Sequence, residues 1–225
     1  GGSMLKRLSL ILIALAFCPG HSPACTLWAA AGADANGGTV ISKNRDWKPD
    51  HTQRLKLVRP KAGLAYFGLY AEGNDDPGLK AGINEKGLTI ISASAHLPKK
   101  LLNNQPGKHG VMAKILAEHA SIDALVADAD KVFGSARAGF FMLADRNKIL
   151  VVEVGLEGQY SYHTVNKGFT THTNHYLDPR LAEFYNGKVG ISSVTRLARI
   201  DELLGQTRPP FTLAQFSVIS RDQRD

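Results

Sequence analysis

The stretch SPACTLWAAAG, residues 22–32, connects a leader-like N-terminus to the first strand that the sequence predicts. Residues 26–32 are mostly apolar and read as a strand. Cys25 stands directly before that strand and directly after Ser-Pro-Ala. The role of this cysteine therefore decides how the N-terminal part of the chain is interpreted.

The residues before Cys25 have the features of an export signal. Lys6 and Arg7 are followed by an apolar run over residues 8–17, and the small residues Ser22 and Ala24 come before the cysteine. A charged region, a short apolar region and an A-x-A-like site are typical of a secretory signal peptide. The apolar run is shorter than the roughly 20 residues that a membrane-spanning helix needs.

Cleavage after Ala24 would divide the chain into three parts. Residues 1–3 read as an expression scar, residues 4–24 as the signal peptide and residues 25–225 as a single domain. No later segment is long and apolar enough to span a membrane. We expect the mature protein to be exported, and to be periplasmic or secreted.

Three interpretations of Cys25 remain open. It is a small buried hydrophobe, as free cysteines often are, or the lipid anchor of a lipoprotein, or an N-terminal nucleophile. Ser22 and Pro23 fit a lipoprotein signal poorly, because an aliphatic residue is expected three positions before the anchored cysteine. As an N-terminal nucleophile, Cys25 would supply both the thiol and the base, its own α-amine.

The proton transfer that this third interpretation needs is chemically reasonable. An α-amine ordinarily titrates near pH ~8 and a thiol near pH ~8.5, so a proton can pass between them close to neutrality. While Ala24 is attached, the nitrogen belongs to an amide and cannot accept the proton. Cys18, the only other cysteine, leaves with the leader, so the mature chain has one thiol and no internal disulfide.

Composition excludes few classes of protein. About 200 mature residues are enough for one domain with its own core. The net charge of +7 loses the two positive charges of Lys6 and Arg7 on processing and becomes +5. The remaining cations are scattered along the chain, which argues against nucleic acid as a partner.

The hydrophobic pattern predicts strands on both sides of a central pair of helices. Strands are predicted over residues 26–32, 37–47, 55–60, 64–70, 79–95 (a hairpin turning at 84–87), 138–154 (a hairpin turning at 145–148), 158–165 and 169–176. Helices are predicted over residues 109–120, 122–133 with Ser121 as the cap, 178–186 and 192–205. Because hairpins dominate, we expect antiparallel sheets covered by helices.

Five short motifs, in order, resemble one enzyme family. They are CTLW at 25–28, KNRDW at 43–47, GINEKGL at 82–88, THTNH at 171–175 and SSVTRLARI at 192–200. The combination is similar to the choloylglycine hydrolase and acyl-CoA:6-aminopenicillanate acyltransferase group of N-terminal nucleophile (Ntn) hydrolases. The resemblance implies an α+β fold, a four-layer αββα sandwich of two antiparallel sheets. Relatives continue beyond the equivalent of residues 207–225 with further strands, which leaves three interpretations open: a C-terminally truncated sandwich, a natural short form, or one piece of a processed protein.

The resemblance also implies the catalytic residues. Cys25 matches the nucleophile, and Asp46 matches an aspartate that pairs with the new α-amine and orients it. Asn174 matches an asparagine whose amide stabilises the oxyanion. Arg196 matches an arginine that neutralises carboxylate charge near the site.

Three further residues are expected to contact the substrate, and two of them depart from the bile-salt type. Lys43 stands where those relatives have an arginine, which keeps the charge but loses the planar fork. Ser94 falls near their second oxyanion asparagine, and Trp47 is expected to line an acyl pocket. These departures favour the acyltransferase-like branch over bile-salt specificity. His172 and His175, three residues apart in a strand-to-turn segment, do not read as a metal site.

The sequence therefore predicts an exported cysteine Ntn amidohydrolase. It would cleave linear amide C–N bonds, or transfer the acyl group, through a thioester on Cys25. The expected partner is a small-molecule acyl amide, with no cofactor, metal, nucleic acid or membrane span, and homo-oligomerisation is left open. The alternatives are a non-catalytic envelope binding protein with the same fold and a lipoprotein anchored through Cys25.

Overall fold

The computed structural model describes residues 24–47, 49–73, 77–98, 100–101, 105, 107, 109–185, 187 and 189–223. The predicted expression scar, and the predicted signal peptide up to residue 23, lie outside the described residues. The division of the chain at Ala24 therefore stays a prediction.

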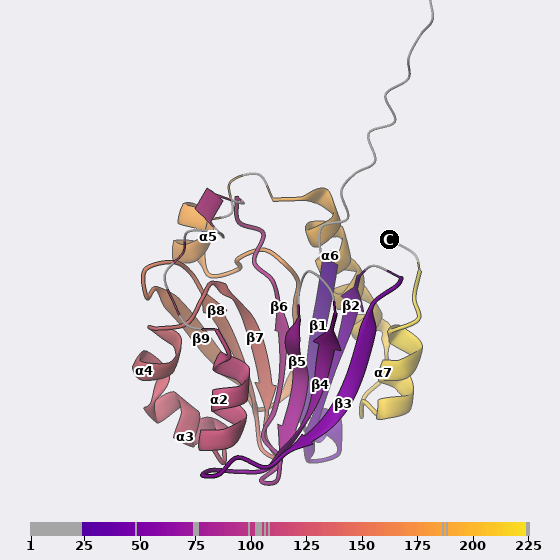
Figure 1. The fold of residues 1–225 in the computed structure, drawn as a ribbon. Helices are drawn as coiled ribbons and strands as arrows, with labels where there is room; N and C mark the ends of the chain where they lie inside the picture. The colour runs from indigo at the N-terminus through magenta and orange to yellow at the C-terminus, as the bar shows by residue number, and fades with distance from the viewer. Residues whose placement is uncertain are drawn as a thin grey trace, which may run out of the picture.

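Two antiparallel sheets form the centre of the molecule (Figure 1). The small sheet has the order β10-β1-β2, and the large sheet runs in sequence order from β3 to β9. The strands are β1 (Ala24–Gly32), β2 (Gly38–Asp46), β3 (Thr52–Val58), β4 (Tyr66–Glu72), β5 (Gly78–Asn84), β6 (Thr89–Ala93), β7 (Gly139–Ala144), β8 (Ile149–Val154), β9 (Tyr160–Val165) and β10 (Gly168–His172). The antiparallel hairpins predicted from the sequence are confirmed.

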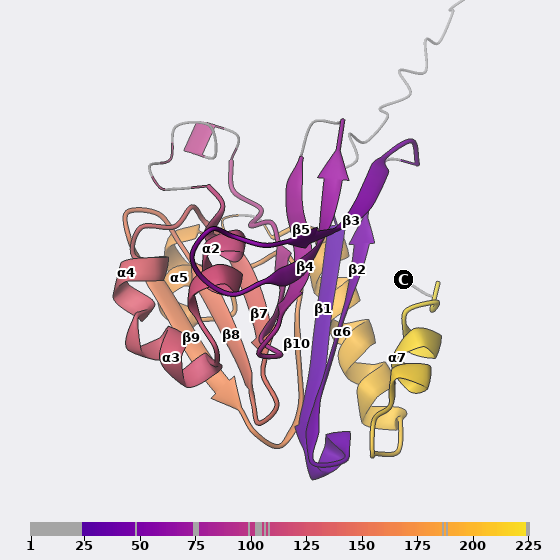
Figure 2. The ribbon, with the colours of Figure 1, turned by 60° about the horizontal axis from the view of Figure 1, so that its bottom comes forward.

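Helices cover the outer face of each sheet, which gives four layers (Figures 1 and 2). Helices α2 (Val111–Glu118), α3 (Ile122–Ala127) and α4 (Ala129–Phe133) pack on the large sheet. Helices α6 (Ile191–Gln206) and α7 (Leu213–Ile219) pack on the small sheet, and α5 (Pro179–Tyr185) follows β10. The expected αββα arrangement is confirmed.

Strand β1 is buried on both faces because its side chains alternate between two cores. Cys25, Leu27 and Ala29 enter the core between the sheets, whereas Trp28 and Ala30 enter the core beneath α6 and α7. Successive side chains of a strand point to opposite faces, so a central strand in a four-layer fold must be apolar at almost every position. Full burial of each large apolar side chain stabilises the fold by about 1.5–3 kcal/mol.

The large sheet uses the same alternation in β7. Phe140 and Met142 face the small sheet, whereas Phe141 and Leu143 face the helices. Every residue of β7 and β8 is buried, including one carboxylate, Glu153. A charged residue in such a strand needs partners within the core.

The small sheet covers only part of the large one in the described chain. One row of paired residues crosses the large sheet from Ile91 on β6, through Ala81 and Leu69, to Leu55 on β3. Ile91, at one end of the row, lies in the core between the sheets. Ile91 is 5% exposed, whereas Leu55 is 66% exposed. The next row, Leu57, Phe67 and Ile83, is exposed as well.

One local expectation needs correction, and one helix was not predicted. The single helix expected over 122–133 is divided into α3 and α4 at Asp128, whose backbone leaves helical geometry and whose carboxylate contacts buried His119. Ser121 does cap α3, as expected, by accepting a hydrogen bond from the Ala124 amide. Helix α7 was not predicted, although Thr212 and Gln215 form a capping box at its start.

We predict that Phe216 holds α7 on the small sheet. Its ring packs against Trp28 and Phe211 and is 2% exposed, whereas Val218 on the same helix is 71% exposed. Phe216→Ala should lower the free energy of unfolding by about 3 kcal/mol, and Val218→Ala should change it by less than about 0.5 kcal/mol. Urea denaturation measures both, and equal effects of the two substitutions would contradict this packing.

Candidate active site

Cys25 lies at the start of β1, where the segment after β10 and helix α6 meet it. It is buried and remains joined to Ala24 by a peptide bond. Its backbone N–H donates a hydrogen bond of 2.8 Å to Oδ1 of Asn174. This nitrogen is the one that cleavage after Ala24 would convert into an α-amine.

The side chain of Asn174 is held in one orientation by three hydrogen bonds. Its Oδ1 accepts from the Cys25 amide at 2.8 Å and from Arg196 at 2.9 Å. Its Nδ2 donates to the backbone carbonyl of Ser94 at 2.8 Å. One Nδ2 hydrogen is left without a protein partner among the described residues, and it is a donor fixed beside Cys25.

The backbone of Asn174 is held as firmly as its side chain. Its N–H donates to Oγ of Ser193 at 3.0 Å, and its carbonyl accepts from the backbone N–H of His96 at 3.1 Å. Asn174 is completely buried. A buried amide that makes this many bonds has little freedom to rotate, so it is a preorganised donor.

Arg196 reaches from α6 to the start of β1. Its guanidinium donates to the backbone carbonyl of Cys25, to Oγ1 of Thr26 at 3.1 Å and to Oδ1 of Asn174. These acceptors are neutral oxygens. In this form of the chain, Arg196 links the predicted nucleophile to the predicted oxyanion residue, while its expected role of neutralising carboxylate charge near the site stays a prediction.

Asp46 lies next to the predicted cleavage site rather than next to the thiol. In the antiparallel register, it pairs with Ala24, and Arg45 pairs with Cys25. Its carboxylate is exposed and makes no hydrogen bond or ion pair within the described part of the chain. Its predicted contact with an α-amine belongs to a processed chain and stays a prediction.

The three predicted substrate-binding residues lie in different surroundings. Lys43 donates from β2 to the backbone carbonyl of Lys80 on β5, at 3.4 Å. The ring of Trp47 stacks under the guanidinium of Arg45, 4.6 Å from its centroid. Ser94 contributes its backbone carbonyl to Asn174, while its side chain is exposed.

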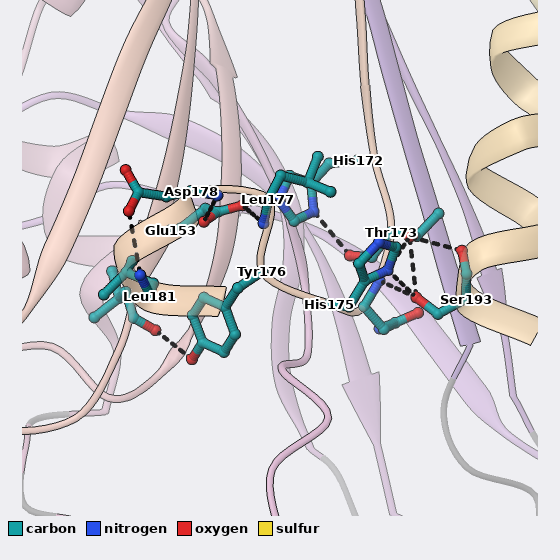
Figure 3. Close-up of polar contacts among 11 residues, drawn as sticks. Glu153, His172, Thr173, His175, Tyr176, Leu177, Asp178, Leu181 and Ser193 are labelled. Carbon is teal, nitrogen blue, oxygen red and sulfur yellow. Dashed lines mark hydrogen bonds and ion pairs between the residues drawn. The ribbon is translucent and has the colours of Figure 1, made fainter. Parts of the chain in front are cut away.

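His172 and His175 serve different parts of one polar network (Figure 3). The ring of His172 contacts Glu153, and the ring of His175 lies 2.8 Å from Oγ of Ser193. Within the described residues, no group of three or more histidine, cysteine or acidic side chains is arranged to hold a metal ion.

Sequence reasoning did not identify Glu153 and Ser193. Glu153 carried a signal, because it is the only charged residue in the apolar strand ILVVEV. Ser193 carried none, since a serine near the start of a helix is common.

Comparison with known families gives a match to the acyl-coenzyme A:6-aminopenicillanic acid acyl-transferase family over residues 33–225. The chain belongs to this family. Together with the Ntn-hydrolase fold, membership places it among the hydrolases and acyltransferases that act on amide bonds, as the sequence resemblance implies.

One solved structure supports the fold. A mutant conjugated bile acid hydrolase from Clostridium perfringens matches with a TM-score of 0.55 and 15% sequence identity, over 87% of this chain and 77% of that chain. A second variant of the C. perfringens conjugated bile acid hydrolase gives a TM-score of 0.44 and 14% identity, over 88% and 70% of the two chains. The first similarity shows the fold alone. A comparison with curated proteins gave no match.

The described helices also bear on membrane association. None of them combines the length and the apolar character that a membrane crossing requires.

We predict that His175 makes the fold of this acyltransferase-family protein sensitive to acid. Burial lowers the pKa of His175 below its usual value of 6.5, and the positive charge of His172 lowers it further. The folded state therefore favours the neutral ring, and the unfolded chain takes up the proton first as the pH falls. The stability that His175 contributes is present above about pH 6.5 and is lost below it.

The variant His175→Asn tests this sign, because its amide can replace Nδ1 beside Ser193 without titrating. Urea denaturation at pH 7.5 and pH 5.5 should show a smaller loss of stability on acidification in the variant than in the parent chain. An equal loss in both proteins would contradict the prediction.

Proposed function

We propose that this protein is an exported cysteine Ntn amidohydrolase, or acyltransferase, that acts through a thioester on Cys25. The observation that carries the proposal is the hydrogen bond of 2.8 Å between the Cys25 nitrogen and Asn174, with one Nδ2 hydrogen of Asn174 still uncommitted. The future amine and an oxyanion donor are thus held side by side before processing. Family membership supports the same chemistry.

The first step in this proposal is the formation of a free α-amine at Cys25. After Ala24 is removed, the Cys25 nitrogen becomes basic and takes the proton from its own thiol. Asn174 already accepts a hydrogen bond from this nitrogen. Asp46, which pairs with Ala24 in the register, is the carboxylate that would then orient the free ammonium group.

The thiolate then attacks the carbonyl carbon of an amide. The developing oxyanion receives the free Nδ2 hydrogen of Asn174 and a backbone N–H. The protonated α-amine gives its proton to the departing amine, which leaves an acyl thioester on Cys25. Water resolves the thioester in a hydrolase, and a second amine resolves it in an acyltransferase.

The substrate class follows from this chemistry. It is a small linear acyl amide, and Lys43 and Arg196 are positive groups that would favour a substrate with a carboxylate. Periplasmic or secreted localisation is part of the proposal, because the leader-like segment precedes Cys25 directly.

We predict that Cys25→Ser lowers turnover of an N-acyl amide panel at least about 100-fold, since an alkoxide forms far less readily than a thiolate. Intact mass of the secreted protein, before and after a thiol-directed acylating probe, gives the independent measurement. The expected mass is that of a chain beginning at Cys25 that gains one acyl group. A mass that includes a diacylglycerol would identify a lipoprotein, and an unreactive Cys25 would identify a non-catalytic protein.

We further predict that Asn174→Ala lowers kcat by about 100- to 1,000-fold, because a single oxyanion donor contributes roughly 2.7–4 kcal/mol. KM should change much less, since the donor acts mainly in the transition state. Ser94→Ala is the comparison variant: it removes the side chain expected to contact the substrate but keeps the backbone carbonyl that holds Asn174, so it should lower kcat less than Asn174→Ala does. Steady-state kinetics measures kcat and KM of both variants. A larger loss of kcat in Ser94→Ala than in Asn174→Ala would contradict the oxyanion role of Asn174.

A further inference from the structure

The segment between β10 and α5 carries Asn174, and one carboxylate binds both of its ends (Figure 3). At the first end, Nε2 of His172 lies 2.7 Å from Oε1 of Glu153. At the other end, the backbone N–H groups of Leu177 and Asp178 donate to Oε1 and Oε2 of Glu153 at 2.6 Å and 2.9 Å. Glu153 therefore closes the base of a loop whose residues 173–176 include the predicted oxyanion donor.

The hydrogen bonds of His172 fix the orientation of its ring toward Glu153. Nδ1 of His172 lies 2.9 Å from the backbone carbonyl of Thr173, which can only accept. Nδ1 is therefore the donor to Thr173. Nε2 shares one proton with Oε1 of Glu153, whose two oxygens also accept two backbone N–H groups.

The pair connects the two sheets across their shared core. Glu153 belongs to β8 of the large sheet and His172 to β10 of the small sheet. Glu153 is 5% exposed and His172 is 1% exposed, and the ring of Phe140 lies 4.4 Å from that of His172. Charges are costly in such a place unless they are paired and hydrogen-bonded, so the geometry of the pair is tightly constrained.

Ser193 fixes the same loop from the side of α6. Its Oγ accepts the N–H of Asn174 at 3.0 Å and lies 2.8 Å from Nδ1 of His175. Thr173 donates from its Oγ1 to the Ser193 carbonyl at 3.0 Å. Glu153 at the base and Ser193 at the side leave the loop few alternative conformations.

We propose that Glu153 is a positioning residue for the amide-cleaving reaction. Resting on the function proposed above, this assignment says that the carboxylate acts through Asn174. By holding His172, Leu177 and Asp178 together, Glu153 keeps the Asn174 amide against the Cys25 nitrogen. A displacement of the donor by about 1 Å can cost ~100-fold in rate.

The variant Glu153→Gln tests the assignment, because it keeps the shape of the side chain but replaces one acceptor oxygen with a donor NH₂ group. We expect kcat for an N-acyl amide to fall about 10- to 100-fold, with KM within roughly threefold of the parent value. Tyr176→Phe is the matched control. It removes a buried hydrogen bond of 2.9 Å from the same loop to the Val154 carbonyl on the same strand, and it leaves in place the side chains of Glu153 and His172 and the backbone N–H groups of Leu177 and Asp178.

A double-mutant cycle separates positioning from general destabilisation. If Glu153 acts through Asn174, then Glu153→Gln should produce little further loss of kcat in the Asn174→Ala background. If the fold-losses of kcat in the two single variants simply multiplied in the double variant, the proposal would be overturned. A kcat loss in Glu153→Gln no larger than that in Tyr176→Phe would overturn it too.

A readout without turnover makes the inference independent of the proposed function. The side-chain NH₂ signals of Asn174, assigned by ¹⁵N NMR, should shift or broaden in Glu153→Gln and stay in place in Tyr176→Phe. If Glu153→Gln fails to fold, His172→Phe replaces it, because it keeps an aromatic ring against Phe140 but removes the contact with Glu153 at the first end of the loop. Unchanged Asn174 signals would overturn the positioning role, whereas equal activity of Cys25→Ser and the parent chain would overturn only the proposed function.

Discussion

The burial of strand β1 on both faces and both edges is the constraint on which the rest of the structure depends. It pairs with β2 and β10, and its side chains fill two cores in alternation. A strand held in this way cannot shift by one residue without exchanging Trp28 for Leu27 between the two cores. Packing therefore fixes the position of Cys25 near the start of β1, before any polar contact is considered.

Polar contacts then determine the geometry around Cys25 more finely than packing does. Asn174, Arg196 and the carbonyl of Ser94 belong to three separate segments, and hydrogen bonds join them at the start of β1. In a buried site, each unsatisfied donor or acceptor would cost about 1–3 kcal/mol. The requirement to satisfy these groups constrains the arrangement on which the proposed acyl transfer depends.

Glu153 and His172 show what such a site requires from the core beneath it. A buried carboxylate–histidine pair contributes little net stability compared with apolar residues of the same shape, so stability alone does not explain its presence. Its partners do, because they include both ends of the loop that carries Asn174. The apolar row from Ile91 to Leu55 shows where the core between the sheets ends. Along this row the side chains change from buried at Ile91 to exposed at Leu55, where the small sheet no longer covers the large one.

The sequence by itself determined the strands, most of the helices and the antiparallel sheets, because alternation and turn residues are local properties. The resemblance of its five motifs to one enzyme family implied the four-layer class. It also identified Cys25, Asn174 and Arg196, which the structure brings together. Only the tertiary structure decided that Ser94 contributes a carbonyl, that Asp46 pairs with Ala24, and that Glu153 closes the Asn174 loop. These contacts join residues far apart in the chain, and their geometry depends on how two sheets and a helix pack, which no local pattern records.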